Sequence, residues 1–163
     1  MRDNKHFKVS AAIPTYNSSK YLDSCINSLK KSKFINEIII HDDHSDKDDY
    51  EKIINIVNKY KNTLNIEIHR NSKNIGAFKN KYENIKKCKN EIVYQIDSDN
   101  LASSNLDKVF NFIYEENNSN ILYLPSRIYQ FKEYPKSAKF FSILRKKFKV
   151  IYTNEDFVVD KDV

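Results

Sequence analysis

The chain has 163 residues, of which 40% are hydrophobic and 13% aromatic, so it can bury a sizeable core within one domain. That composition excludes wholesale disorder, and two cysteines are too few for a disulfide framework or a zinc site. The formal net charge of +6 is typical of a lysine-rich solvated surface, and we expect no nucleic-acid partner.

The N-terminal residues Met1–Lys5 contain no signal-peptide core, and no segment approaches the ~20 apolar residues of a membrane span. We therefore expect a cytoplasmic protein, with peripheral contact to a membrane as an alternative. Cys25 and Cys88 fall on apolar positions of predicted helices, which favours buried free thiols.

Short apolar runs alternate with helical periodicity along most of the chain. Strands begin roughly every 27–30 residues, which is about the size of one strand–helix unit. The pattern predicts a doubly wound, mostly parallel α/β sheet with helices on both faces. Strands are predicted at Phe7–Ile13, Glu37–His41, Leu64–His69, Glu91–Ile96 and Ile121–Leu124, and helices with apolar faces at Leu22–Leu29, Ile53–Tyr60, Phe78–Ile85 and Val109–Ile113.

Polar residues at two predicted helix starts are placed to act as caps. Ser18 or Ser19 can cap the first helix, and Ser45 can cap the second. The acidic residues Asp46, Asp48 and Asp49 would then lie near the positive end of the second helix dipole.

The regular alternation fades after Pro125. The segment Ser137–Lys149 places four large apolar residues on one helical face and basic residues on the other. This pattern is typical of a helix that closes the core, and an interfacial membrane helix is the alternative. We expect residues 1–135 to form the α/β domain and 136–163 to begin with this basic amphipathic helix.

Polar residues follow each of the first four predicted strands. Ligands of open parallel sheets bind beyond the carboxyl ends of the strands, so these residues would share one rim. The rim has no glycine-rich phosphate cradle, and its carboxylates would repel a bare diphosphate. A phosphate ligand there requires a divalent cation. The four sets are Pro14–Asn17, Asp42–Asp46, Arg70–Gly76 and Asp97–Asn100.

Asp97 and Asp99 are the predicted ligands of that cation. Residues two apart on an extended backbone point the same way, so both carboxylates would face one ion. Such oxygen ligands suit Mn²⁺ or Mg²⁺, with substrate phosphates completing the coordination. The alternative is an Asx turn before the next helix, but the position after a buried strand favours the metal site. His44 is a further possible ligand, although an exposed loop histidine is the favoured interpretation.

Four motifs, each after the expected strand, resemble those of family 2 glycosyltransferases of the GT-A type. The resemblance covers Val9–Leu124 and implies the nucleotide-sugar-binding part of a glycosyltransferase. It implies metal-dependent transfer of a sugar, with a UDP-sugar favoured, to a hydroxyl of a glycan, lipid or protein acceptor with inversion. The motifs are Ile13–Asn17, Asp42-Asp43 with Ser45, Asn74 with Gly76, and Gln95–Asn100.

The resemblance also implies roles for individual residues. Asp43 would accept a hydrogen bond from the nucleobase, Asp97 would lie near the ribose or the metal, and Asp99 would bind the metal. Lys79 is matched to an arginine of the family. The implied nucleotide-sugar-binding set is Pro14, Thr15, Tyr16, Asn17, Asp43, Asn74, Gly76, Lys79, Asp97 and Ser98.

No catalytic base is assigned. The family's base lies well beyond the D-x-D, on the acceptor side, and Glu155-Asp156 is the only late acidic pair. This favours the N-terminal part of a longer enzyme or a reduced domain, with residues 136–163 starting the acceptor-side region. A non-catalytic nucleotide-sugar-binding module is one alternative. A response-regulator-like receiver is another, since Asp42-Asp43 resembles its acidic pair, but His69–Asn71 and Pro125-Ser126 stand where its Asp and Lys belong.

Overall fold

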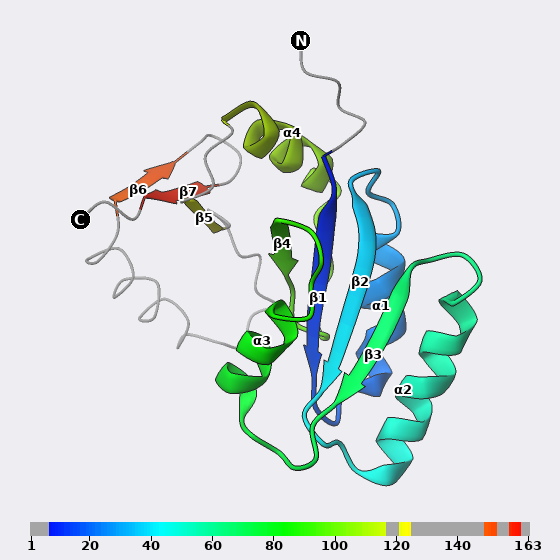
Figure 1. The fold of residues 1–163 in the computed structure, drawn as a ribbon. Helices are drawn as coiled ribbons and strands as arrows, with labels where there is room; N and C mark the ends of the chain where they lie inside the picture. Colours follow the sequence, from blue (N-terminus) through cyan, green and yellow to red (C-terminus); the bar gives the residue numbers. More distant parts are fainter. Residues whose placement is uncertain (1–6, 117–120, 125–148, 153–156, 161–163) are drawn as a thin grey trace, which may run out of the picture. The chain divides into compact units, whose positions relative to one another are not determined.

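The structure is a computed structural model that describes residues 7–116, 121–124, 149–152 and 157–160 (Figure 1). The chain divides into two compact units, Met1–Phe110 and Asn111–Val163. The domain boundary expected at residue 135 lies outside the described residues. So does the predicted helix Ser137–Lys149, apart from Lys149 itself, which begins a strand.

A parallel four-stranded sheet forms the centre of the first unit, with its strands in the order β3-β2-β1-β4. Helices connect the successive strands, so the predicted doubly wound α/β fold is confirmed. The strands are β1 (Val9–Thr15), β2 (Ile35–Asp42), β3 (Ile66–Arg70) and β4 (Ile92–Gln95). The helices are α1 (Ser19–Leu29), α2 (Lys47–Tyr60), α3 (Ala77–Ile85) and α4 (Leu106–Glu116), which crosses the boundary of the unit.

The order of the strands creates a switch point between β1 and β4. The chain moves outward from β1 to β2 and β3, then returns across the sheet to β4 on the other side of β1. Because such crossovers are right-handed, the return places α3 on the opposite face of the sheet from α1, as Figure 1 shows. Ligands of doubly wound sheets bind in the crevice at this switch point.

β1 lies at the centre of the core, and all seven of its residues are buried. Ile38, Ile39 and Ile40 of β2 are buried beside it. Leu22, Ile26 and Leu29 recur along α1 at helical spacing and are fully buried, as predicted. This packing holds the carboxyl ends of β1 and β2 in a fixed position.

Pro14 lies near the end of this central strand, where proline normally interrupts hydrogen bonding. The Ala12 carbonyl accepts a hydrogen bond from the N–H of Ile96, so Ala12 faces β4. Pro14, two residues later, faces the same side. The pairing of β1 with β4 ends at Ala12 and Gln95, two residues before Pro14, whose missing N–H could not continue it. β1 and β4 therefore part at Pro14, and the crevice begins there.

Helix α3 presents polar residues to the sheet. Its buried residues are Asn80 and Asn84, while Phe78, Tyr82 and Ile85 are 87%, 59% and 40% exposed. The predicted helix exists, but the expectation that Phe78–Ile85 forms its buried face is wrong. The reason is directional hydrogen bonding: the Asn80 amide donates to the His41 carbonyl (2.9 Å) and its oxygen accepts from Asn71 (3.0 Å).

The predicted helix caps are also wrong in detail. Ser18 and Asp46 occupy the N-cap positions of α1 and α2, but neither side chain caps its own helix. The Asp49 carboxylate instead accepts hydrogen bonds from the N–H and hydroxyl of Ser19 (3.2 and 2.6 Å). The Ser45 hydroxyl donates to Asp42. The side chain of Asp49, in the first turn of α2, thus satisfies the start of α1.

The second unit contains an antiparallel sheet in the order β5-β7-β6. The predicted strand Ile121–Leu124 is confirmed as β5, but it pairs with β7 rather than with the parallel sheet. The other strands are β6 (Lys149–Tyr152) and β7 (Phe157–Asp160). In the described part of the chain, no helix combines the length and apolarity needed to cross a membrane.

Candidate functional site

A chain of hydroxyl groups joins the loops on the two sides of the crevice. The Ser18 hydroxyl is 2.8 Å from that of Thr15 and 2.7 Å from that of Ser98. Thr15 and Ser98 are buried, whereas Tyr16, which follows Thr15, is half exposed. The structure therefore brings Thr15 at the end of β1 and Ser98 beyond β4 together at the switch point.

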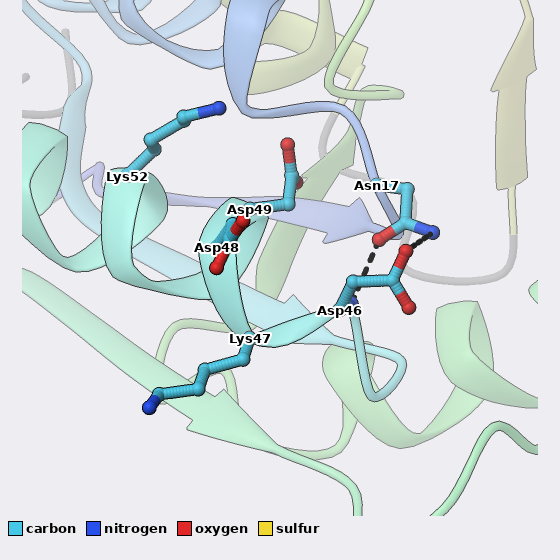
Figure 2. Close-up of a pocket in the computed structure, with 6 residues that line it drawn as sticks. All are labelled: Asn17, Asp46, Lys47, Asp48, Asp49 and Lys52. Atoms are coloured by element: carbon cyan, nitrogen blue, oxygen red, sulfur yellow. Dashed lines mark hydrogen bonds between the residues drawn. The ribbon is translucent and has the colours of Figure 1, made fainter.

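Asn17 forms hydrogen bonds with residues of the loop after β2. Its side chain and Asp46 exchange two hydrogen bonds of 3.1 and 2.9 Å (Figure 2). The N–H of Asn17 also donates to the Ser45 hydroxyl at 2.9 Å. Asn17 has a φ of 47°, a left-handed conformation that asparagine tolerates better than most residues. These bonds hold the loop after β1 against the loop after β2.

The same two loops border a surface pocket of about 430 Å³, which Figure 2 shows. Both acidic and basic side chains line it, and Asp43, Asp97 and Asp99 are not among them. The pocket is therefore separate from the predicted diphosphate site. Its lining consists of Asn17, Asp46, Lys47, Asp48, Asp49 and Lys52.

Asp42 is fully buried and is a structural residue. Its carboxylate accepts hydrogen bonds from the N–H and hydroxyl of Ser45 and lies 3.3 Å from Nε of Arg70. Arg70 also donates to the Ser45 carbonyl at 2.6 Å and stacks over the Tyr50 ring at 3.9 Å. This ion pair closes the loop after β2 against the end of β3.

Asp43 holds the loop between β3 and α3. Its buried carboxylate accepts three hydrogen bonds: Oδ1 from the Asn71 amide (2.8 Å) and the Ile75 N–H (2.9 Å), and Oδ2 from the Gly76 N–H (2.9 Å). A carboxylate has room for about four such bonds, so one acceptor position on Oδ2 remains. Sequence reasoning did not foresee the structural use of Asp43.

Gly76 begins α3 with a φ of 89° and a ψ of 148°, a conformation that residues with a Cβ rarely adopt. A Cβ at this position would meet no atom within 4 Å, so the glycine is needed for its backbone and not for lack of space. The exposed Asn74 side chain accepts from the Gly76 N–H at 3.0 Å and supports the turn. Asn74 and Gly76 therefore shape the loop that Asp43 holds.

The Asp97–Asn100 segment is a turn. The strand ends at Gln95, and the Asn100 N–H donates to the Asp97 carbonyl at 2.9 Å. The expectation of an extended backbone that aligns Asp97 with Asp99 is therefore wrong. Asp99 is exposed and forms no hydrogen bond or ion pair with the residues that the structure describes.

Asp97 has a cationic partner inside the protein. Nζ of Lys81 lies 2.7 Å from Oδ1 and 2.9 Å from Oδ2 of Asp97, and the Gln95 amide donates to Oδ1 at 3.0 Å. Lys79, the lysine matched to a family arginine, is exposed and forms no hydrogen bond or ion pair within the described ranges. The cation at the D-x-D is therefore Lys81, which no sequence signal indicated because its position depends on the rotation of α3.

Asp97 and Asp99 can hold a divalent cation only if a bound phosphate or water supplies further oxygen ligands. No cluster of three or more metal-ligating side chains exists among the described residues. Mg²⁺-type sites, however, are commonly built from one or two carboxylates plus substrate phosphates and water. Asp99 is free to bind, and Asp97 is partly exposed beside it. His44 does not join them, because its Nδ1 lies 3.1 Å from the Asn71 carbonyl.

Neither cysteine provides a reactive thiolate near neutral pH, because the pKa of each thiol is raised. Burial, reinforced by the charges of Asp99 and Asp97, raises the pKa of the Cys25 thiol to about 12. Burial and the charge of Glu37 raise the pKa of Cys88 to about 11. Both are free, and Cys88 is half-buried beyond the end of α3 rather than on a helix. The Cys25 thiol lies 3.9 Å from the Asp97 carbonyl oxygen, so the D-x-D turn packs against α1.

Residues 10–161 of the chain match the family described as Glycosyl transferase family 2, which is most of the sequence. A relative in Staphylococcus aureus, the poly(ribitol-phosphate) β-N-acetylglucosaminyltransferase TarS, is 32% identical over 119 residues. That match covers 71% of this chain and 20% of the relative. The chain belongs to glycosyl transferase family 2.

Two solved structures have the same fold. S. aureus TarS 1-349 in complex with UDP-GlcNAc superposes with a TM-score of 0.65 and 30% identity, covering 80% of this chain and 37% of that one. The mannosyltransferase PcManGT from Pyrobaculum calidifontis, in complex with GDP-Man and Mn²⁺, has a TM-score of 0.65 and 15% identity, covering 94% and 44%. The chain thus spans less than half of the length of these proteins. A receiver domain is excluded by the family match.

Proposed function

We propose that this chain binds the nucleotide-sugar donor of a glycosyltransferase, with a UDP-sugar as the favoured donor. The observation that carries the proposal is the convergence of the loops after β1, β2 and β4 at the switch point of the sheet. There the Thr15–Ser18–Ser98 hydroxyl chain, buried at Thr15 and Ser98, ties the D-x-D turn to the loop that carries the half-exposed Tyr16. The structure of TarS with UDP-GlcNAc supports the choice of nucleotide.

The nucleobase would lie against Pro14, Thr15 and Tyr16. Tyr16 offers an exposed ring for stacking, and the remaining acceptor position on Asp43 Oδ2 suits the N3–H of uracil. The base would therefore approach the loop that Asp43 holds.

Asp97 and Asp99 would hold Mn²⁺ or Mg²⁺ together with the diphosphate of the donor. When bound, the cation would supply positive charge to the diphosphate leaving group. The reaction would form a bond from an acceptor hydroxyl oxygen to the anomeric carbon as the bond from that carbon to the diphosphate oxygen breaks, with inversion. The hydroxyl proton would pass to a carboxylate base, and no described residue is assigned to that role.

Calorimetry with UDP tests the proposal. We expect UDP to bind in the presence of Mn²⁺ or Mg²⁺ and to lose at least tenfold in affinity without the cation or in the Asp99→Ala variant. Asp48→Ala is the matched control, because Asp48 is also exposed and acidic but lies outside the crevice. Equal affinity with and without the cation, or an unchanged Asp99→Ala variant, would refute the metal assignment.

A further inference from the structure

We propose that Lys81 is an exchangeable counter-ion for Asp97. Its ammonium group neutralises Asp97 in the ligand-free protein and transfers to the donor diphosphate when a divalent cation takes the Asp97 carboxylate. The inference rests on the proposed function, because it concerns the same carboxylate pair. It makes Lys81 a positioning residue that favours binding of the cation and the diphosphate together.

The ion pair occupies both oxygens that a cation would need. Nζ of Lys81 contacts Oδ1 and Oδ2 of Asp97 at 2.7 and 2.9 Å, so a metal ion cannot approach this carboxylate without moving the ammonium. The side chains of Lys81 and Asp97 are 34% and 41% exposed. Water can therefore solvate both groups when they separate, and the pair can open without burying an unpaired charge.

The rotation of α3 places Lys81 in this position. Asn80 is fixed by hydrogen bonds to the His41 carbonyl and the Asn71 amide, which set the inward direction of the helix. Neighbouring residues of a helix point about 100° to either side of that direction. Lys81 meets Asp97 on one side, and Lys79 is exposed on the other. The hydrogen bonds that turn Asn80 towards the sheet thus also place Lys81, and not Lys79, beside Asp97.

The charges of the site explain why exchange is favoured over simple release. Two carboxylates and one ammonium leave the ligand-free site with a small negative charge. A divalent cation alone would place excess positive charge beside Lys81, whereas the negative diphosphate would accept both cations. The long, flexible stem of lysine lets Nζ move between the two anionic partners without movement of the backbone. Lys81 should therefore oppose binding of the metal alone and support binding of the metal with the nucleotide.

Calorimetry on three proteins tests whether Lys81 weakens the binding of the metal alone and strengthens the binding of UDP with the metal. Wild type, Lys81→Met and Lys61→Met are titrated with MnCl₂ alone and then with UDP in saturating MnCl₂, and circular dichroism confirms their folding. We expect Lys81→Met to bind Mn²⁺ alone about three- to tenfold more tightly and UDP with Mn²⁺ about tenfold more weakly than wild type. Lys61→Met removes the same charge from an exposed position at the C-cap of α2, outside the binding set, and should match wild type in both titrations.

Three results would overturn the inference. These are unchanged Mn²⁺ affinity in Lys81→Met, unchanged UDP affinity in that variant, or equal changes in Lys61→Met that trace to net charge alone. Failure of the proposed function looks different, because wild type itself would then bind no UDP in the presence of Mn²⁺.

Discussion

The Asp43 carboxylate accepts a hydrogen bond of 2.9 Å from the backbone N–H of Gly76. This bond joins the end of β2 to the N-cap residue of α3. It also binds Asn71 and Ile75 of the same loop. One buried side chain thus fixes the loop that carries α3 and, through α3, Lys81. Structure and proposed donor binding depend on the same carboxylate.

Replacing Asp43 with asparagine should destabilise the fold. The new NH₂ group would face one of the N–H donors that the carboxylate now satisfies, leaving buried donors unpaired. We expect a loss of about 2–3 kcal/mol in the free energy of unfolding, measured by urea denaturation. Asp48→Asn, an exposed substitution, should change it by less than about 0.5 kcal/mol. A stable Asp43→Asn protein would show that the loop is held by other contacts.

Gly76→Ala isolates the effect of the backbone conformation. A Cβ there meets nothing within 4 Å, so any loss of stability must come from the φ of 89° and not from a steric clash. We expect a loss of about 1–3 kcal/mol by urea denaturation. Ala77→Gly, one residue into the helix, should cost less, about 0.5–1 kcal/mol. Similar losses for both variants would mean that the loop relaxes to accept the alanine.

Because α3 buries Asn80 and exposes Phe78, substitutions at these two positions should differ in their effect on stability. Asn80→Leu buries a side chain of similar size but leaves the His41 carbonyl and the Asn71 amide without their partner, and we expect a loss of about 2–4 kcal/mol. Phe78→Ser changes an exposed residue and should stay within about 0.5 kcal/mol of wild type. Thermal or chemical unfolding of the two variants measures both. A large loss in Phe78→Ser would place that ring in the core.

His41 should make stability depend on pH. Burial, followed by the nearby His69, lowers the pKa of His41 in the folded protein below its ordinary value near 6.5. The unfolded chain then binds the proton more readily, so the contribution of neutral His41 is present above about pH 6.5 and is lost as the pH falls below it.

Urea denaturation from pH 7.5 to 5 measures this effect. The decline of stability should be shallower in His41→Gln, by at most about 1.4 kcal/mol per pH unit. An identical slope in His41→Gln would mean that His41 titrates normally in the folded state.

The order of strands and helices in the first unit follows from periodicity alone. Ile38, Ile39 and Ile40 form an uninterrupted apolar run because a central parallel strand is covered on both faces. Turn residues and apolar spacing then locate the elements to within a few residues. The pairing of Ile121–Leu124 with a distant strand was not predictable, because a short apolar run contains no information about its partner.

The side-chain geometry of the site was predictable only in part. The positions of Asp43, Asp97 and Asp99 after their strands follow from the sequence, since the chain must leave each strand at the same rim. The orientation of α3 does not, because it depends on a hydrogen bond between Asn80 and a carbonyl 39 residues earlier in the chain. Apolar spacing pointed to Phe78 as the inward residue, and the family resemblance pointed to Lys79, whereas the lysine that pairs with Asp97 in the structure is Lys81.

The single glycine of the chain has a consequence for the unfolded state. The left-handed turns of the described residues outside Gly76 are made by Asn17 and His44, whose side chains limit the backbone even when the protein is unfolded. A chain with so few glycines explores fewer conformations before folding, so less entropy is lost when the rim loops become ordered. Substituting glycine for Asn17 or His44 would relieve local strain in the folded protein and, at the same time, enlarge the unfolded ensemble. The order of the rim loops therefore depends on the unfolded state as well as on the folded state.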